Sequence, residues 1–145
     1  MENQNYNNHS RYYVPHHLVF YPLTLALGVF CFYQGNKNPA LKEIWWTLTA
    51  IMIMIVFLAF MVRQHYGLKN QDRIIRIEMR YRYFVVTGER FELLESKLTN
   101  SQIFALRFAS DNELKDLVNK TLSENLTSKV IKQSIQNWQA DNWRL

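Results

Sequence analysis

The sequence has little of what small proteins use for tight turns, cross-links and metal sites. It contains one Cys, four Gly and three Pro in 145 residues. A single Cys excludes an internal disulfide framework and a Cys-rich zinc site. The low Gly and Pro content argues against an all-β chain with many turns, and against a collagen-like or disordered one. The length leaves room for one domain, not for a multidomain enzyme.

Charge is missing from two long stretches. Asp, Glu, Lys and Arg are absent from Val14 to Gln34 and again from Ile44 to Val62. A helix over the second stretch spans roughly 28 Å, which matches the hydrocarbon core of a bilayer. A chain this small has too little other apolar mass to surround two such helices. We therefore predict membrane-spanning helices over residues 15–34 and 44–66, although the mean hydropathy of the whole chain is only −0.23.

A cleaved signal peptide is the main alternative for the first span. No pair of small residues follows the apolar run at the spacing of a cleavage site. We expect the segment to remain in the protein as an anchor.

The residues around the spans predict a topology. Aromatic side chains that we expect at the membrane interfaces are Tyr12, Tyr13, Tyr33, Trp45 and Trp46. The polar loop 35–43 between the spans carries Lys37 and Lys42. The other side carries seven basic residues: Arg11, Arg63, Lys69, Arg73, Arg76, Arg80 and Arg82. This imbalance predicts that both termini lie in the cytoplasm and the loop outside.

Residues 69–87 have helical periodicity and follow the second span as a stalk. With Arg63, the basic stripe Lys69, Arg73, Arg76 and Arg80 is expected to contact anionic lipid or an acidic partner. An apolar stripe formed by Ile74, Ile77, Tyr81 and Phe84 is expected to pack against later helices. The spacing also predicts ion pairs Asp72–Arg76 and Glu78–Arg82. Gly67 is a candidate hinge and Gly88 a candidate helix stop.

Residues 91–145 predict a small helical bundle. Capping boxes occur at Thr99–Gln102 and Ser110–Glu113, and Thr127 or Ser128 is placed to cap a last helix. A core of this size is marginal alone, so we expect the bundle to dock on the stalk, on another copy or on a partner. Its balanced charge argues against nucleic-acid binding. The N-terminal segment 1–14 is polar, without periodicity.

No residue pattern predicts catalysis, a metal site or a cofactor. The four His residues lack carboxylates at ligand spacing and are interpreted as interfacial, while Cys31 is interpreted as a packing residue. The spans hold no charged group of the kind that marks a transport path. Arg107 is expected to pair with Asp111 or Glu78. The candidates for partner docking are Arg107, Asp111, Trp138, Trp143 and Arg144.

Four strings carry a resemblance to a known family. They are Asn5-Tyr6-x-Asn8-His9-x-Arg11, Gln71-Asp72-Arg73-x-Ile75-Arg76-x-Glu78-Met79-Arg80, Ala105-Leu106-Arg107-Phe108-Ala109-Ser110-Asp111 and Trp138-Gln139-Ala140-Asp141-x-x-Arg144. The chain resembles, over essentially its whole length, an uncharacterised family of short bacterial inner-membrane proteins with two spans and a helical tail, filed as a domain of unknown function. The resemblance implies no activity, substrate or catalytic residue.

Together these features predict an all-α protein. A transmembrane hairpin occupies residues 15–66, and a cytoplasmic tail occupies residues 67–145 with stalk and bundle. The predicted function is that of a non-enzymatic inner-membrane accessory or scaffold protein whose tail docks a protein partner or another copy, without a small-molecule substrate. Two alternatives stay open: a membrane-surface regulator that senses anionic lipid, and an enzyme on a lipid-like substrate. An open polar pocket at Arg107–Asp111 would favour the enzyme, and a closed ion pair would not.

Overall fold

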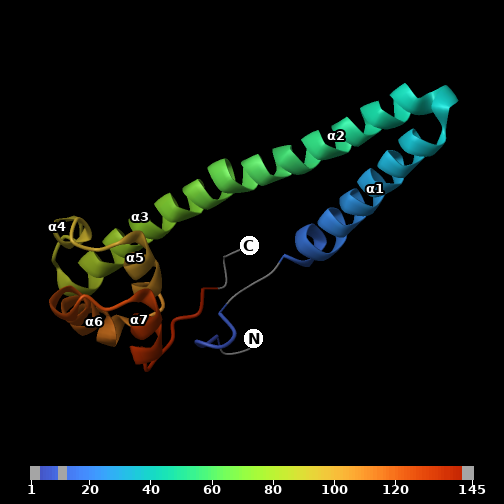
Figure 1. Ribbon diagram of the computed structural model, residues 1–145. Coiled ribbons are helices and arrows are strands. Elements are labelled where there is room, and N and C mark those ends of the chain that lie inside the picture. Colours follow the sequence, from blue (N-terminus) through green and yellow to red (C-terminus); the bar gives the residue numbers. More distant parts are fainter. Residues whose placement is uncertain (1–3, 10–12, 142–145) are drawn as a thin grey trace. The chain divides into compact units, whose positions relative to one another are not determined.

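The computed structural model describes residues 4–9 and 13–141 (Figure 1). Over these residues the chain is helical and has no strand, apart from one isolated bridge between Ala109 and Trp138. The predicted all-α class is confirmed. The contacts divide the chain into two units. Residues 13–69 form the helix-pair unit, and residues 4–9 and 70–141 form the tail unit.

The helix-pair unit consists of two long helices joined by a short connection. Its elements are the π-helical turn η1 (Pro15–Phe20), α1 (Tyr21–Lys37), the 3-10 turn η2 (Pro39–Leu41), α2 (Lys42–Met61) and the π-helical segment η3 (Val62–Leu68). Asn38 leaves the helical region between α1 and η2, with φ −115° and ψ 89°. Pro15 and Pro39 each stand at the first position of a helical segment, where a missing N–H costs nothing.

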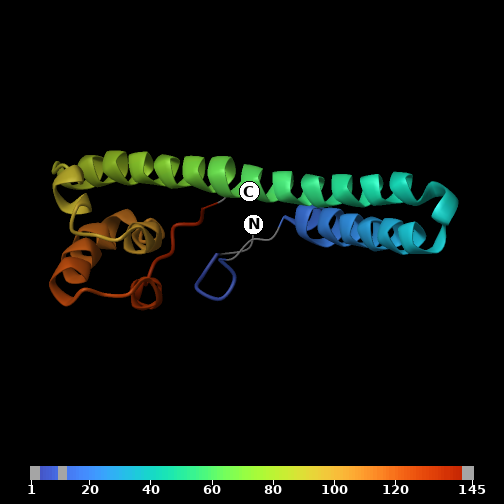
Figure 2. The ribbon, with the colours of Figure 1, turned by 45° about the horizontal axis from the view of Figure 1, so that its top comes forward.

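Glycines let α1 and α2 lie side by side in antiparallel directions (Figures 1 and 2). A Cβ atom added to Gly35 would lie 3.1 Å from the indole of Trp46, and one added to Gly28 would lie 3.7 Å from the Cβ of Met52. The rings of Phe30 and Trp45 meet edge to face at 5.7 Å. Small residues at these positions allow close helix approach, as in membrane helix pairs.

The rest of both helices faces outward. The exposed fraction is 68% for Leu25, 70% for Met54 and 61% for Phe57. Cys31 is buried, in agreement with its interpretation as a packing residue. The helices Pro15–Lys37 and Pro39–Thr87 are each long and apolar enough to cross a membrane by length and composition.

Gly67, the candidate hinge, lies in a helical segment. The backbone is helical without interruption from Pro39 to Thr87, and Gly67 lies inside η3. A glycine costs a helix only about 1 kcal/mol relative to alanine, so flanking residues outweigh its flexibility. The local change at Gly67 is a shift to π-type hydrogen bonding.

The tail unit consists of α3 and four shorter helices. They are α3 (Lys69–Thr87), α4 (Glu92–Glu95), α5 (Asn100–Leu106), α6 (Asp111–Glu124) and α7 (Ser128–Ser134). Both predicted capping boxes are present, at Thr99 and at Ser110, and Thr127 caps α7. Gly88 ends α3 with φ +72°, as expected.

The N-terminal segment is part of the tail unit, although its sequence shows no periodicity. The Asp141 backbone N–H donates to Oε1 of Gln4, which is buried. The His9 ring lies 5.9 Å from the rings of Phe108 and Trp138. His9, interpreted from the sequence as an interfacial residue, is half-buried beside these rings of distant sequence.

Candidate functional site on helix α3

Helix α3 presents one face to the core of the tail unit. Ile75, Met79 and Tyr83 are buried, with exposed fractions of 5%, 0% and 1%. They pack with Phe91, Ile103 and other core residues of the unit. A spacing of four residues keeps these three side chains on one stripe of the helix.

The predicted packing of the other apolar stripe on later helices was wrong. Ile74, Ile77, Tyr81 and Phe84 are all more than half exposed. At 100° per residue this stripe lies opposite Ile75 and Met79. Within residues 4–9 and 13–141, this apolar face therefore has no packing partner, whereas the opposite face of α3 is buried in the core.

A buried carboxylate on α4 forms ion pairs with two residues of the basic stripe. Glu95 is 8% exposed and pairs with Arg76 and with Arg80, whose Nε donates to Oε2 at 2.7 Å. Arg76 also donates to Asn100. Three other predicted lipid or partner contacts, Arg63, Lys69 and Arg73, are exposed and form no ion pair within residues 4–9 and 13–141.

Arg82 joins α3 to the start of α6 and to the end of α5. Its Nε lies 2.6 Å from Oδ1 of Asp111, and its NH1 donates to the Arg107 carbonyl at 2.9 Å. Its NH2 donates to the Ala109 carbonyl. The intrahelical pairs predicted for Arg76 and Arg82 give way to these partners, because carboxylates and carbonyls of the folded bundle lie within reach.

Arg107 pairs with Asp141 at 3.2 Å, where a pair with Asp111 or Glu78 was expected. Its guanidinium also lies over the Phe108 ring, 4.4 Å from the centroid. Trp138 packs on the same ring at 4.9 Å, in line with its default interpretation as a packing residue. The other docking candidates, Trp143 and Arg144, lie outside the described residues.

Four of the predicted interfacial aromatic residues lie near the ends of the helix-pair unit's helices. Tyr13 and Tyr33 are more than half exposed, and Trp46 is 38% exposed. Lys37 donates to the Tyr33 hydroxyl at 3.0 Å. Trp45 is half-buried, and Tyr12 lies outside the described residues.

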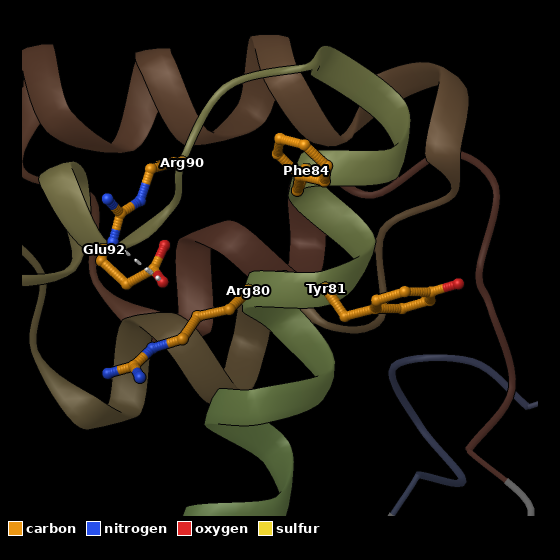
Figure 3. Close-up of a pocket in the computed structure, with 5 residues that line it drawn as sticks. All are labelled: Arg80, Tyr81, Phe84, Arg90 and Glu92. Atoms are coloured by element: carbon orange, nitrogen blue, oxygen red, sulfur yellow. Dashed lines mark ion pairs between the residues drawn. The ribbon is translucent and has the colours of Figure 1, made fainter.

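Two grooves border the exposed face of α3. One, of about 320 Å³, is lined by Arg80, Tyr81, Phe84, Arg90 and Glu92. Figure 3 shows Arg80 and Tyr81 projecting to different sides of α3, and Arg90 beside Glu92 with an ion pair of 3.7 Å. The second groove, of about 430 Å³, is lined by Glu78, Tyr81 and Val85 of α3. Arg107 and Asp111, which pair with Asp141 and Arg82 respectively, also line it.

Titratable groups in the tail unit respond to burial and to their partners. Burial raises the pKa of Tyr83, and the nearby Glu89 carboxylate raises it further. Burial alone would raise the pKa of Glu113, but hydrogen bonds from the backbone N–H groups of Gln136, Ser110 and Asn137 outweigh it and lower this pKa. A hydrogen bond to Glu89 at 2.8 Å raises the pKa of Lys115.

Sequence reasoning missed Glu95, the buried acceptor for two arginines. Nothing in the local sequence distinguishes Glu95 from Glu92, which is not buried. Across residues 4–9 and 13–141, three or more His, Cys, Asp or Glu side chains nowhere gather as metal ligands would.

Comparison with known proteins identifies the chain at the family level. Neither the curated proteins nor the solved structures include a match. The model of a family of unknown function, DUF6526, matches residues 1–145. The predicted resemblance to an uncharacterised family is confirmed, and the chain belongs to the DUF6526 family.

Proposed function

We propose that this protein is a non-enzymatic accessory or scaffold protein of the bacterial inner membrane. In this proposal α1 and α2 form a transmembrane hairpin, and α3 with its bundle forms a cytoplasmic tail that docks a protein. The observation that carries the proposal is the uncharged, outward-facing apolar surface of the helix pair.

The exposure of that surface supports a membrane anchor over the core helix of a soluble protein. The most apolar 18-residue windows of the two long helices are 11% and 0% buried. The core helix of a soluble protein would be mostly covered by its own chain. Contiguous exposed apolar surface on this scale is unfavourable in water and favourable in hydrocarbon.

The tail unit supports a hairpin with both termini on one side. Gln4 and His9 precede the two apolar helices in sequence, whereas their partners Asp141 and Trp138 follow them. A segment before the spans can fold with a segment after them only if the chain crosses the bilayer an even number of times. The excess of Lys and Arg near these segments favours the cytoplasmic side.

The arrangement of charges in the tail supports binding more than catalysis. Arg82 with Asp111 joins α3 to the start of α6, and Arg107 with Asp141 joins the end of α5 to the segment after α7. The groove at Arg107 and Asp111 is open, but both charges are already held in ion pairs with Asp141 and Arg82. Aromatic and aliphatic side chains share the lining of both grooves with charged ones. Such mixed surfaces are typical of protein docking sites.

Purification in mild detergent tests the proposal. The full chain should stay in the membrane fraction through an alkaline carbonate wash. It should also co-purify with a partner protein or as an oligomer. Release by carbonate would contradict the membrane anchor. Recovery of a monomer alone would contradict the scaffold role.

A second candidate function, sensing of anionic lipid, is favoured by the basic residues nearest the second span. Arg63 and Lys69 are exposed, and each precedes the helix residues that Glu95 engages. Each basic residue near a membrane surface contributes about 1 kcal/mol of attraction to anionic headgroups. Arg63→Glu with Lys69→Glu should lower protection of the tail from chymotrypsin in phosphatidylglycerol vesicles but not in phosphatidylcholine vesicles. Equal protection of wild type in both vesicles would contradict this function.

A further inference from the structure

The exposed face of α3 has the pattern of a short coiled-coil seam. Ile74, Ile77, Tyr81 and Phe84 follow a 3-4-3 spacing and are 55%, 61%, 72% and 54% exposed. This spacing is that of the a and d positions of two heptads, which form the seam between paired helices. The seam lies opposite the buried face of α3, so a second helix can reach it without disturbing the bundle.

The charges beside the seam favour one partner and one direction. Arg73 takes a g position and Glu78 the e position five residues later, and both are exposed. In a parallel in-register pair, Arg73 of each helix lies beside Glu78 of the other. In an antiparallel pair, g positions face g positions, so Arg73 and Arg80 of the two copies would face each other. Neither Arg73 nor Glu78 forms an ion pair within the described segments 4–9 and 13–141.

We propose that two copies of this chain pair through a parallel Ile74/Ile77/Tyr81/Phe84 seam on α3, with symmetric Arg73–Glu78 ion pairs. This proposal rests on the membrane anchor and names another copy as the occupant of the docking surface. Two chains anchored with the same topology leave the bilayer in the same direction, and α3 begins eight residues after α2 ends. Their α3 helices therefore start at the same depth and run parallel.

Confinement to a bilayer explains how so short a seam binds. Two heptads are marginal for a soluble coiled coil, because few buried residues offset the entropy of association. Anchoring both chains in one membrane raises their effective concentration and reduces that cost. The seam ends at Gly88 on one side and at Asn70 on the other, which limits the pairing to α3 itself.

Charge exchange tests the pairing of the full chain in proteoliposomes, with dimer formation measured by energy transfer between differently labelled copies at several lipid-to-protein ratios. Arg73→Glu and Glu78→Arg should each weaken the dimer about tenfold, because two attractions become two repulsions. The double variant Arg73→Glu with Glu78→Arg should restore it. Failure of the double variant to recover would overturn the proposed register. Anionic-lipid binding by this face predicts the opposite sign for Glu78→Arg, because the added positive charge would tighten attachment to phosphatidylglycerol vesicles.

Cross-linking tests the direction of the pairing. In a Cys31→Ser background, Ile74→Cys should link to itself through a short bis-maleimide in proteoliposomes at low protein density. Asn119→Cys, exposed on α6, is the matched control and should not link. Linkage of Ile74→Cys only to Phe84→Cys in mixed samples would show antiparallel pairing and overturn the proposal.

The charge-exchange and cross-linking experiments, read together with membrane fractionation and co-purification, separate this inference from the proposed function. A membrane-bound monomer that still co-purifies with a different protein would contradict the α3 dimer but not the scaffold role. A dimer insensitive to Glu78→Arg and without the Ile74→Cys link would place self-association elsewhere in the chain. A chain absent from the membrane fraction would end the proposed function.

Discussion

Arg82 is the residue on which three parts of the tail unit converge. Its guanidinium reaches Asp111 at the start of α6 and the carbonyls of Arg107 and Ala109 just after α5. The carbonyls at the end of a helix lack intrahelical partners, and a cation there satisfies them. The side chain is 16% exposed, so water replaces these bonds poorly if they are lost.

Replacing Arg82 should therefore loosen the α5–α6 junction. We expect Arg82→Ala to destabilise the tail unit by about 1.5–3 kcal/mol, the range for hydrogen bonds that involve a charged group. Hydrogen exchange of the α5 and α6 amides in the full chain measures the effect. Arg90→Ala is the control and should cost less than about 0.5 kcal/mol, because its pair with Glu92 is exposed. Equal effects of the two variants would contradict the role given to Arg82.

Glu113 makes the tail unit sensitive to acid. Its carboxylate accepts backbone N–H groups from Ser110, Gln136 and Asn137, each at 3.1 Å, and these bonds lower its pKa in the folded protein. A carboxyl group with a lowered folded pKa stabilises the fold above its unfolded pKa and loses that contribution as pH falls through the folded value. The loss should occur below the ordinary value of 4.5.

Glu113→Gln should remove this component of acid sensitivity. At neutral pH the variant should be less stable than wild type by about 1–2 kcal/mol, because charge-assisted bonds are lost. The gap should shrink as pH falls below 4.5, and urea unfolding at several pH values measures it. The exposed Glu124→Gln variant should match wild type at neutral pH. A constant gap at all pH values would contradict the assignment.

At the scale of elements, α3 shows how far periodicity reaches. The helix over 69–87 and its stop at Gly88 follow from local sequence, as do the caps at Thr99, Ser110 and Thr127. Which of the two apolar stripes of α3 packs inward does not follow from local sequence. Ile75 and Met79 are no more apolar than Ile74 and Ile77, and the inward face is selected by Glu95 and Asp111, which are distant in sequence. Local signals therefore predicted the elements, the caps and the packing of the bundle on α3, but not which stripe of α3 packs inward or which ion pairs form.

The two faces of α3 predict opposite responses to truncation. Met79→Ala should destabilise the tail unit by about 2–5 kcal/mol, because it leaves a cavity in a fully buried position. Ile77→Ala should leave the tail unit within about 0.5 kcal/mol of wild type, because the side chain is 61% exposed. Hydrogen exchange on a dilute, monomeric sample compares the two. A larger cost for Ile77→Ala would contradict the assignment of the inward face.

At the scale of the whole molecule, one folding unit is assembled from both ends of the chain. Residues 4–9 join residues 70–141, and the two apolar helices are inserted between them in sequence. Composition alone predicted two spans and a basic juxtamembrane segment. It did not predict this closure, because Gln4 and His9 have no periodic pattern and are recognised only by the Asp141 backbone and the Phe108 and Trp138 rings. The closure supports the same-side topology independently of the positive charges.

Site-directed maleimide labelling in sealed vesicles of known orientation tests the membrane-anchored account most directly. In a Cys31→Ser background, Ala40→Cys probes the connection between α1 and α2, and Asn119→Cys probes the tail unit; both positions are exposed. The account predicts that an impermeant maleimide labels Ala40→Cys only from the outer side and Asn119→Cys only from the cytoplasmic side. Labelling of both positions from the same side would contradict the two-span anchor.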